Sequence, residues 1–539
     1  MFNLNDLQKI TSILSPSGLY ENFKTLLHSY EKKVGENEDL KKEVEELKDR
    51  LRKLIGEQEI PKFKPNDEKP HHPRPKKDSD KKNWKKKGKK NDIKIEREEN
   101  CPVDKATLPA DAEYKGTRSV KIQNVVVKTE NIQFNIERWY SPSQKKYFEG
   151  NLPSGYQGSQ FGPDLRSLIV MLYVGLRSTE NKIEKFLTDL GVIISAGEIS
   201  KILMTVPPKV AEEMYAAREI ATLKRPYYNI DATGMSVGTR SCYNLCHGND
   251  LFSFHSTVND RSRHEAIKSL IMCDDLIYIL DTQAFEWIEG KNILNKNQLR
   301  KLKEQLSDNH LTVPQIEKIA LDLAAQDKKQ SNVIMTGALK SSLRTVYKYL
   351  LPAVLVSDAA GEYKEIVDAH QECWIHELRH FREIKIKSDY VQEELDLFFK
   401  NAWNLFDLME SYKFYPTVEI RKKIESDFDL IFKKEYHSFM INHCCANTRS
   451  RKAGLLLFLD YPTIPIHNNQ VESYVREKVV RRKISGGHKN DRGAAAGNMW
   501  ISLYQTCRKN SLSFYYYLKD RFREMNQIAQ LSEIIALRT

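Results

Sequence analysis

Apolar residues between positions 20 and 56 recur with a seven-residue period, and charged residues fill most of the positions between them. The a positions are Phe23, Tyr30, Asn37, Val44 and Leu51, and the d positions are Leu26, Lys33, Leu40, Leu47 and Leu54. The pattern predicts a coiled coil, and an asparagine at an a position favours two strands in fixed register. Residues 1–56 are therefore expected to join copies of the chain. A single amphipathic helix that packs on its own protein is the alternative.

Proline and lysine dominate residues 57–98. Five prolines alternate with charged residues, and a lysine-rich run then includes Lys85, Lys86 and Lys87. Such a composition cannot bury enough apolar surface to fold, so a disordered basic linker is expected. Its lysines would bind the phosphates of a nucleic acid, with a strong dependence on salt. A linker that only keeps the chain soluble is an alternative compatible with this one.

Residues 99–150 contain two short segments typical of strands, from Ser119 to Val127 and from Ile132 to Tyr140. They predict a small β element. Cys101 precedes them as the first cysteine of a zinc ribbon would, but no further cysteine occurs before Cys242. A structural zinc site needs four ligands, so none is expected here.

Residues 151–222 have the apolar spacing of helices. One helix is expected to bury Ile183, Phe186, Leu187 and Leu190, and Gly191 then makes a turn. The Ser195-Ala196-Gly197-Glu198 run has the form of a capping box, which starts a second helix. Helix, turn and capped helix is the outline of a helix-turn-helix, which predicts a helical DNA-binding domain. An ordinary helix hairpin has the same outline.

Residues 223–280 and 351–490 change to a mixture of strands and helices. Strand-like segments run from Tyr227 to Ile230, from Cys242 to Cys246 and from Leu251 to His255, and a helix is expected from Arg261 to Met272. An entirely apolar strand from Pro352 to Ser357, typical of a buried parallel pair, comes later. This order predicts an α/β fold with an RNase H-like mixed sheet flanked by helices.

That fold places one acidic residue on its first strand, one after its fourth strand and one on a late helix. Asp231, Asp358 and Glu472 occupy these three positions. Residues 281–350 have helical patterns and are expected as an insertion into this core, and residues 491–539 as a C-terminal helical segment. Asp281 also follows an apolar strand, Leu276 to Leu280, and is therefore a rival to Asp358.

Composition narrows the class of protein. The chain has 539 residues, a net charge of +12 and a pI near 9.0, which favours a polyanionic partner. Its longest apolar run, Leu168 to Val174, is far shorter than the roughly 20 residues that a membrane span needs. No signal peptide is recognisable at the start. Eight scattered cysteines form no disulfide framework and suit a reducing cytosol.

The segment around Glu472 is expected to be a helix that begins near Asn468 or Asn469, both good N-caps. Its buried face would hold Val471, Val475, Val479 and Ile484. Basic residues follow the acid, namely Arg476, Arg481, Arg482 and Lys483. An acid among bases is typical of a metal ligand beside phosphate-binding groups. A surface helix with an ordinary Glu472–Arg476 ion pair is the alternative.

Three carboxylates suffice for two-metal phosphoryl chemistry. Carboxylate oxygens bind Mg²⁺, and two ions about 4 Å apart can activate the attacking oxygen and stabilise the leaving one. The chain has no Gly-x-x-x-x-Gly-Lys loop, so nothing in it indicates ATP use.

Several motifs resemble those of a known family, the insertion-sequence-66 transposases, which are bacterial DDE enzymes. The run from His467 to Lys483 is similar to the family's Asn-Asn-x-x-Glu-x-x-x-Arg…Arg-Lys signature. Ile230-Asp231-Ala232-Thr233 resembles its first Asp-x-Thr strand. The run Ser357-Asp358-Ala359-Ala360-Gly361-Glu362-Tyr363 resembles its second Asp, which favours Asp358 over Asp281, and Cys373 to Phe381 resembles its Cys-x-x-His-x-x-Arg-x-Phe block.

The resemblance implies cleavage of the DNA ends of an insertion sequence and transfer of the freed 3′-hydroxyls to target DNA. Asp231, Asp358 and Glu472 would hold two Mg²⁺ ions, with Mn²⁺ as a substitute, and the bases of the Glu472 helix would bind DNA phosphates. Accessory residues would be Cys373, His376, Arg379 and Asn469. Without further ligands nearby, Cys373 and His376 are expected to brace a helix rather than bind zinc.

The resemblance implies four partners: the terminal inverted repeats of the element, target DNA, a second copy of the chain and accessory proteins of the element. It also implies a location in the bacterial cytoplasm, at the nucleoid and not at a membrane. The chain departs from the family in keeping only Cys101 of the ribbon cysteines, so residues 99–150 are expected as a degenerate ribbon. Two alternatives stay open. One is a catalytically silent DNA-binding regulator, and the other is an RNase H-like nuclease without strand transfer.

Overall fold

The structure is a computed structural model of the whole chain, and it describes residues 95–538 apart from 105–106, 110, 123, 274, 325–326 and 385–388. The expected coiled coil over residues 20–56, and with it Lys85, Lys86 and Lys87 of the basic linker, lies outside the described residues.

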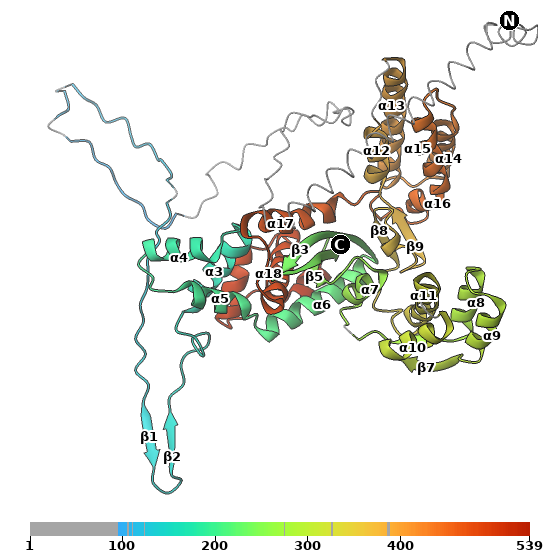
Figure 1. Cartoon of the computed structure of the whole chain (residues 1–539). Coiled ribbons are helices and arrows are strands. Elements are labelled where there is room, and N and C mark those ends of the chain that lie inside the picture. The colour runs from blue at the N-terminus through green and yellow to red at the C-terminus, as the bar shows by residue number, and fades with distance from the viewer. Residues whose placement is uncertain are drawn as a thin grey trace, which may run out of the picture.

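A five-stranded mixed sheet forms the centre of the molecule (Figure 1), with the strand order β5-β4-β3-β8-β9. Its strands are β3 (Tyr227–Val237), β4 (Arg240–Gly248), β5 (Ser253–Val258), β8 (Val354–Ser357) and β9 (Ala369–Glu372). The first three pair antiparallel, and β8 and β9 continue the sheet in parallel from β3. The predicted mixture of strands and helices is confirmed.

The two faces of this sheet are buried in separate cores. Successive side chains of a strand point to opposite faces. Tyr228 and Leu355 accordingly belong to one hydrophobic cluster, whereas Tyr227, Val354 and Val356 belong to the other. All four residues of β8 are buried, as expected for a parallel strand that is covered on both sides.

Helices that lie far apart in the sequence cover the sheet (Figure 1). Side chains of α6 (Pro208–Lys224), α7 (Arg263–Ile271) and α18 (Asp491–Lys509) contribute to the first core. Side chains of α12 (Trp374–Arg382), α13 (Asp389–Tyr412), α14 (Val418–Lys433) and α15 (Phe439–Ser450) contribute to the second. The short α16 (Lys452–Leu455) follows α15 and leads towards α17 (Asn469–Ser485).

The segment between α7 and β8 contains α8 (Thr282–Gly290), α9 (Lys296–Lys303), α10 (Val313–Ala324) and α11 (Lys328–Thr345). These helices agree with the helical patterns in the sequence. Strand β6 (Tyr278–Leu280) lies within the expected apolar strand from Leu276 to Leu280, but its antiparallel partner β7 (Ser307–Leu311) was not predicted. The exposed polar residues of β7 gave no strand signal.

The expected β element before residue 150 is smaller than predicted. No strand covers the described residues from Ser119 to Val127, and the second expected strand is reduced to β1 (Arg138–Ser141), which pairs with β2 (Lys146–Glu149). The apolar side chains of the first segment, such as Ile122 and Val126, are exposed. Their strand propensity forms no strand because no neighbouring strand pairs with them.

Helices α3 (Pro163–Gly175), α4 (Glu180–Asp189) and α5 (Ala196–Met204) come before α6 in the chain. Ser195 caps α5 by accepting a hydrogen bond from the Glu198 N–H at 3.3 Å, as predicted. Ile183 and Leu187 are buried, but Phe186 is exposed. The chain ends with α19 (Phe514–Phe522) and α20 (Leu531–Ala536), and α20 contacts α6. None of the described helices combines the length and the apolar character that crossing a membrane requires.

Candidate active site

Asp231 and Asp358 lie at the same level of two neighbouring parallel strands. The strand register pairs Asn229 of β3 with Val356 of β8. Asp231 and Asp358 each come two residues later in the chain. In a parallel pair the two backbones advance together, so the two carboxylates lie side by side where β8 ends.

The electrostatics of Asp231 agree with this arrangement. Burial is the largest cause that raises the pKa of the Asp231 carboxyl to about 7, and the negative charges of Asp358 and Glu472 contribute to the same rise. The Ala232 N–H, which donates a hydrogen bond to Asp231 Oδ1 at 2.8 Å, acts in the opposite direction. Three acidic groups from distant parts of the sequence therefore share one electrostatic environment.

Helix α17 carries Glu472 and packs across the strands beside Asp231. Val471 and Val475 form a small apolar cluster with Cys246 of β4. Cys246 is the register partner of Asp231. Glu472 lies between the two valines in sequence, so this packing fixes the first turn of the helix next to the carboxylate of Asp231. The predicted helix is confirmed, except that Ile484 at its far end is exposed rather than buried.

Asn468 joins the start of α17 to β3. It is the N-cap residue, but its side chain does not cap the helix. Its Nδ2 donates to the Ile230 carbonyl at 2.8 Å, and its Oδ1 accepts from Asn229 Nδ2 at 2.8 Å. The expected capping role is therefore wrong for this side chain, because the strand offers it two buried partners. Asn469 is the exposed first residue of the helix.

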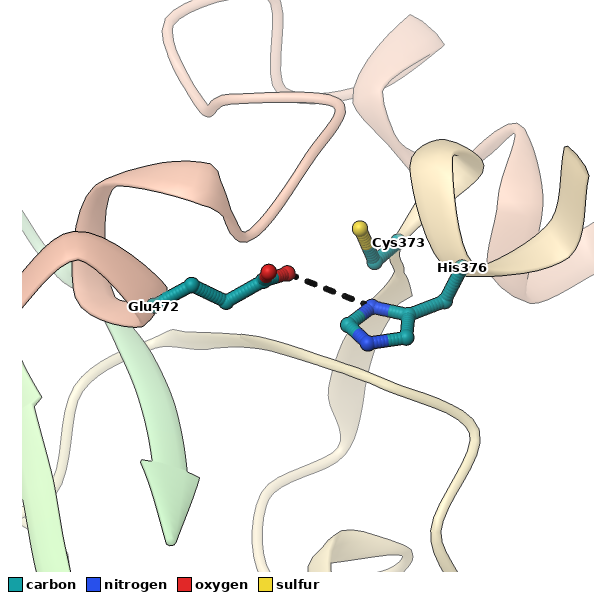
Figure 2. Close-up of side chains that lie close together, drawn as sticks. All are labelled: Cys373, His376 and Glu472. Carbon is teal, nitrogen blue, oxygen red and sulfur yellow. Dashed lines mark ion pairs between the residues drawn. The ribbon is translucent and has the colours of Figure 1, made fainter. Parts of the chain in front are cut away.

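Glu472 faces the start of α12 (Figure 2). Its Oε1 lies 3.5 Å from His376 Nδ1, and its Oε2 lies 3.8 Å from Arg379 Nη2. Among the described residues these are the ion pairs of Glu472, so the alternative of an ordinary pair with Arg476 does not hold. Burial lowers the pKa of His376, although the charge of Glu472 acts in the opposite direction.

Three residues near Asp358 were not predicted as site residues from the sequence, namely Arg261, His370 and Tyr363. Arg261 pairs with Glu362 at 2.6 Å. His370 lies 2.8 Å from the hydroxyl of Ser357, the residue before Asp358. The buried Tyr363 hydroxyl has no hydrogen-bond partner in the described part of the chain. Burial raises its pKa, and the charges of Asp231 and Asp358 add to this effect. No periodicity or spacing in the sequence indicates these contacts.

The chemistry of these donors suits a divalent cation, but Asp231, Asp358 and Glu472 do not form a ready-made cluster of three ligands, and among the described residues Glu472 instead clusters with Cys373 and His376. Carboxylate oxygens are the ligands that Mg²⁺ prefers. Glu472 Oε1 is buried and has no hydrogen-bond partner among the described residues. The pKa of Asp231 is raised mainly by burial and in smaller part by the charges of Asp358 and Glu472, so its ionised form lacks a fully compensating positive charge. A bound cation would compensate it.

The four predicted phosphate-binding residues of α17 divide into two pairs, and the fifth basic residue of the helix, Lys478, is buried. Arg476 and Lys483 are exposed. Arg481 is turned inward, where it donates to the Tyr173 carbonyl at 2.6 Å and stacks 3.4 Å from the centre of the Tyr173 ring. Arg482 donates to the Gly234 carbonyl of β3. The first pair is available to an external phosphate, and the second pair holds the helix on the protein.

Asp281, the rival acid, has a structural role. It is the N-cap of α8 and accepts a hydrogen bond from the Ala284 N–H at 2.8 Å. Its other oxygen accepts from the Ser341 hydroxyl of α11 at 2.5 Å. Both oxygens are therefore engaged within the helical segment.

Comparison with known proteins agrees with the motifs in this region. Residues 327–496 match the family model described as Transposase IS66 family. This range includes Asp358 and Glu472, whereas Asp231 precedes it. A Sinorhizobium fredii (strain NBRC 101917 / NGR234) protein, named Uncharacterized protein y4jO, is 27% identical over 322 residues, which are 58% of this chain and 96% of that protein. The family match supports a transposase-related function, which implies binding to DNA.

Proposed function

We propose, from the premise that residues 327–496 form a domain of the transposase IS66 family, that this chain is a DNA transposase. It cleaves the DNA ends of an insertion sequence and joins the freed 3′-hydroxyls to target DNA. The strand order β5-β4-β3-β8-β9, with three antiparallel strands followed by two parallel ones, supports an RNase H-like catalytic core.

Asp231, Asp358 and Glu472 are the proposed catalytic carboxylates, and they hold two Mg²⁺ or Mn²⁺ ions. When bound, such ions activate the attacking oxygen and stabilise the leaving one in a displacement at phosphorus. The protein contributes the positions of the carboxylates. Strands β3 and β8 fix the two aspartates, and the Asn468 side chain ties the first turn of α17 to β3.

Arg476 and Lys483 are the proposed contacts to the DNA backbone, because they are exposed on the helix that carries Glu472. Lysine and arginine contacts to phosphates fix the position of a protein on DNA without reading its sequence. The inward contacts of Arg481 and Arg482 make these residues supports of α17 instead. Copies of the chain associate through residues 20–56 in this proposal, as a dimer or a higher oligomer.

The observation that most directly supports the proposal is geometric: the strand register brings Asp231 level with Asp358, and the first turn of α17 packs against Cys246, the register partner of Asp231. The test is Mg²⁺-dependent nicking and joining of labelled element ends by the full chain, with the Asp358→Asn variant beside it. Loss of a metal ligand is expected to reduce the rate on the order of 10³-fold, because metal ions supply several kcal/mol of transition-state stabilisation.

Asp281→Asn is the matched control, since Asp281 also follows a strand but caps a helix. The folded fraction of this variant should keep its nicking rate. Nicking without joining would leave a nuclease without strand transfer. No metal-dependent cleavage by the folded chain would leave a DNA-binding regulator.

A further inference from the structure

Cys373, His376 and Glu472 form a cluster of three potential metal ligands at the junction of α12 and α17 (Figure 2). One ligand atom of each residue lies within 4.8 Å of those of the other two. Cys373 and His376 come from the first turn of α12, and Glu472 comes from the first turn of α17. The cluster is therefore built by two elements that the sheet brings together.

The cysteine of this cluster is already positioned by the backbone of the other helix. Cys373 is 2% exposed, and its Sγ accepts a hydrogen bond from the Asn468 N–H at 3.1 Å. Burial raises the pKa of the Cys373 thiol to about 11, and the Asn468 N–H acts in the opposite direction because it stabilises the thiolate, the form of cysteine that binds metals. The backbone of Asn468 thus supports both Cys373 and, through its carbonyl at the start of α17, the turn that carries Glu472.

The other two ligand atoms face each other without hydrogen bonds. His376 Nδ1 and Glu472 Oε1 are both buried and lack a hydrogen-bond partner among the described residues. They lie 3.5 Å apart. In a tetrahedral zinc site, with bonds of about 2.0 Å to nitrogen and oxygen, two such ligands are separated by roughly 3.3 Å. The pair already has nearly this separation.

We propose that Cys373, His376 and Glu472 bind one Zn²⁺ ion, and that this ion takes Glu472 away from the Mg²⁺ pair. Binding releases the proton of the Cys373 thiol to water, and a water molecule fills the fourth position. The inhibitory half of this inference rests on the proposed function, because it needs Glu472 as a ligand of Mg²⁺. The zinc site itself does not.

Ligand chemistry separates the two ions. A thiolate and an imidazole are soft or borderline ligands that favour Zn²⁺, whereas Mg²⁺ favours oxygen ligands. Glu472 can serve either ion, but its carboxylate is held in the cluster with Cys373 and His376 and, among the described residues, forms no such cluster with Asp231 and Asp358. Arg379 pairs with the other oxygen of Glu472 at 3.8 Å, and its side chain is 47% exposed, so it can move aside into solvent.

The zinc site is tested with Co²⁺, which occupies zinc sites and, unlike Zn²⁺, absorbs visible light. Co²⁺ bound to a thiolate gives a sulfur-to-metal charge-transfer band, which the full chain should show at one equivalent and lose when Zn²⁺ is added. Cys373→Ser should remove the band. His376→Gln and Glu472→Gln should weaken Zn²⁺ binding by about 100-fold or more, since loss of even a neighbour of a metal ligand costs about 10- to 100-fold.

Cys101→Ser and Cys444→Ser are the matched controls, because these cysteines lie outside the cluster and are at least partly exposed. Both variants should keep the band. Circular dichroism reports whether each variant folds, and His376→Gln serves if the buried Cys373 does not tolerate change. Absence of the band in the native chain, or its persistence in the Cys373→Ser and His376→Gln variants, would overturn the site.

The competition between Zn²⁺ and the Mg²⁺ pair for Glu472 is measured as the release of bound Mn²⁺, which stands in for Mg²⁺, and not as a loss of activity. Electron paramagnetic resonance of free Mn²⁺ should show that Zn²⁺ releases Mn²⁺ from the native chain. Retention of bound Mn²⁺ on a zinc-loaded chain would overturn the sharing of Glu472. A cobalt band on a folded chain that never cleaves DNA would count against the proposed function and leave the zinc site intact.

Discussion

The Asn468 side chain donates a hydrogen bond to the carbonyl of Ile230, the residue before Asp231, at 2.8 Å. Asn468 also precedes α17, and its carbonyl accepts from the Glu472 N–H at 3.2 Å. One asparagine therefore links the backbone beside the first acid to the turn that carries the third. The distance between these two carboxylates depends on this residue.

Asn468→Ala should lower the free energy of unfolding by about 1–3 kcal/mol, because it removes the buried hydrogen bonds to the Ile230 carbonyl and from the Asn229 amide. It should also weaken Mn²⁺ binding, since Glu472 loses its fixed position. Urea denaturation and Mn²⁺ titration measure the two effects. Asn469→Ala is the control, and as a change of an exposed residue it should stay within about 0.5 kcal/mol. Equal effects in both variants would contradict the role of Asn468.

Asp231→Asn should make the metal-free protein more stable at alkaline pH. Burial raises the pKa of Asp231 to about 7 in the folded chain. The unfolded value is near 3.9, so folding favours the protonated acid. The stability that this proton contributes is complete below pH about 4 and is lost as the pH rises through 7.

With EDTA present, the gain from Asp231→Asn should therefore be near zero at pH 4 and on the order of 4 kcal/mol at pH 8. Denaturant titrations at several pH values measure it. Asp189→Asn, a change of an exposed acid on α4, is the control and should show no such trend. A gain for Asp231→Asn that does not depend on pH would contradict the raised pKa of Asp231, which burial and the two neighbouring acids cause.

Arg476→Ala with Lys483→Ala should weaken DNA binding and reduce its dependence on salt. Each phosphate contact contributes about 0.9 to the slope of log K against log salt, so the slope should fall by about 1 to 2. Fluorescence anisotropy at several salt concentrations measures it, with circular dichroism to show an unchanged fold.

Arg481→Ala, on the same helix, should instead lower stability by about 1–3 kcal/mol, because it removes a buried hydrogen bond and a stack on Tyr173. Its effect on the salt slope of folded protein should be small. A fall in slope for Arg481→Ala as large as that for the exposed pair would place this arginine on the DNA.

The sequence predicted those features of the site that local patterns encode. An apolar run that ends in an acid marks the end of a buried strand, and this located Asp231 and Asp358 correctly on β3 and after β8. Apolar spacing located Glu472 on a helix. The same local rule also marked Asp281, which caps a helix instead, since the pattern does not reveal which groups the acid meets in space.

Contacts between distant segments were beyond such patterns. Arg481 and Arg482 looked like phosphate ligands, but their partners Tyr173 and Gly234 lie hundreds of residues earlier in the chain. The approach of Glu472 to Cys373 and His376 is of the same kind. These contacts depend on how the two cores pack against the sheet, and local sequence patterns do not encode that packing.

The central claim is that Asp231, Asp358 and Glu472 converge on shared divalent ions. Fe²⁺ bound in place of Mg²⁺, with ascorbate and peroxide, generates hydroxyl radicals that cut the backbone close to the ion. Cuts are expected near all three residues. Excess Mg²⁺ should suppress these cuts, and Asp358→Asn should abolish them. Cuts near only one of the three, or cuts that Mg²⁺ does not suppress, would contradict the claim.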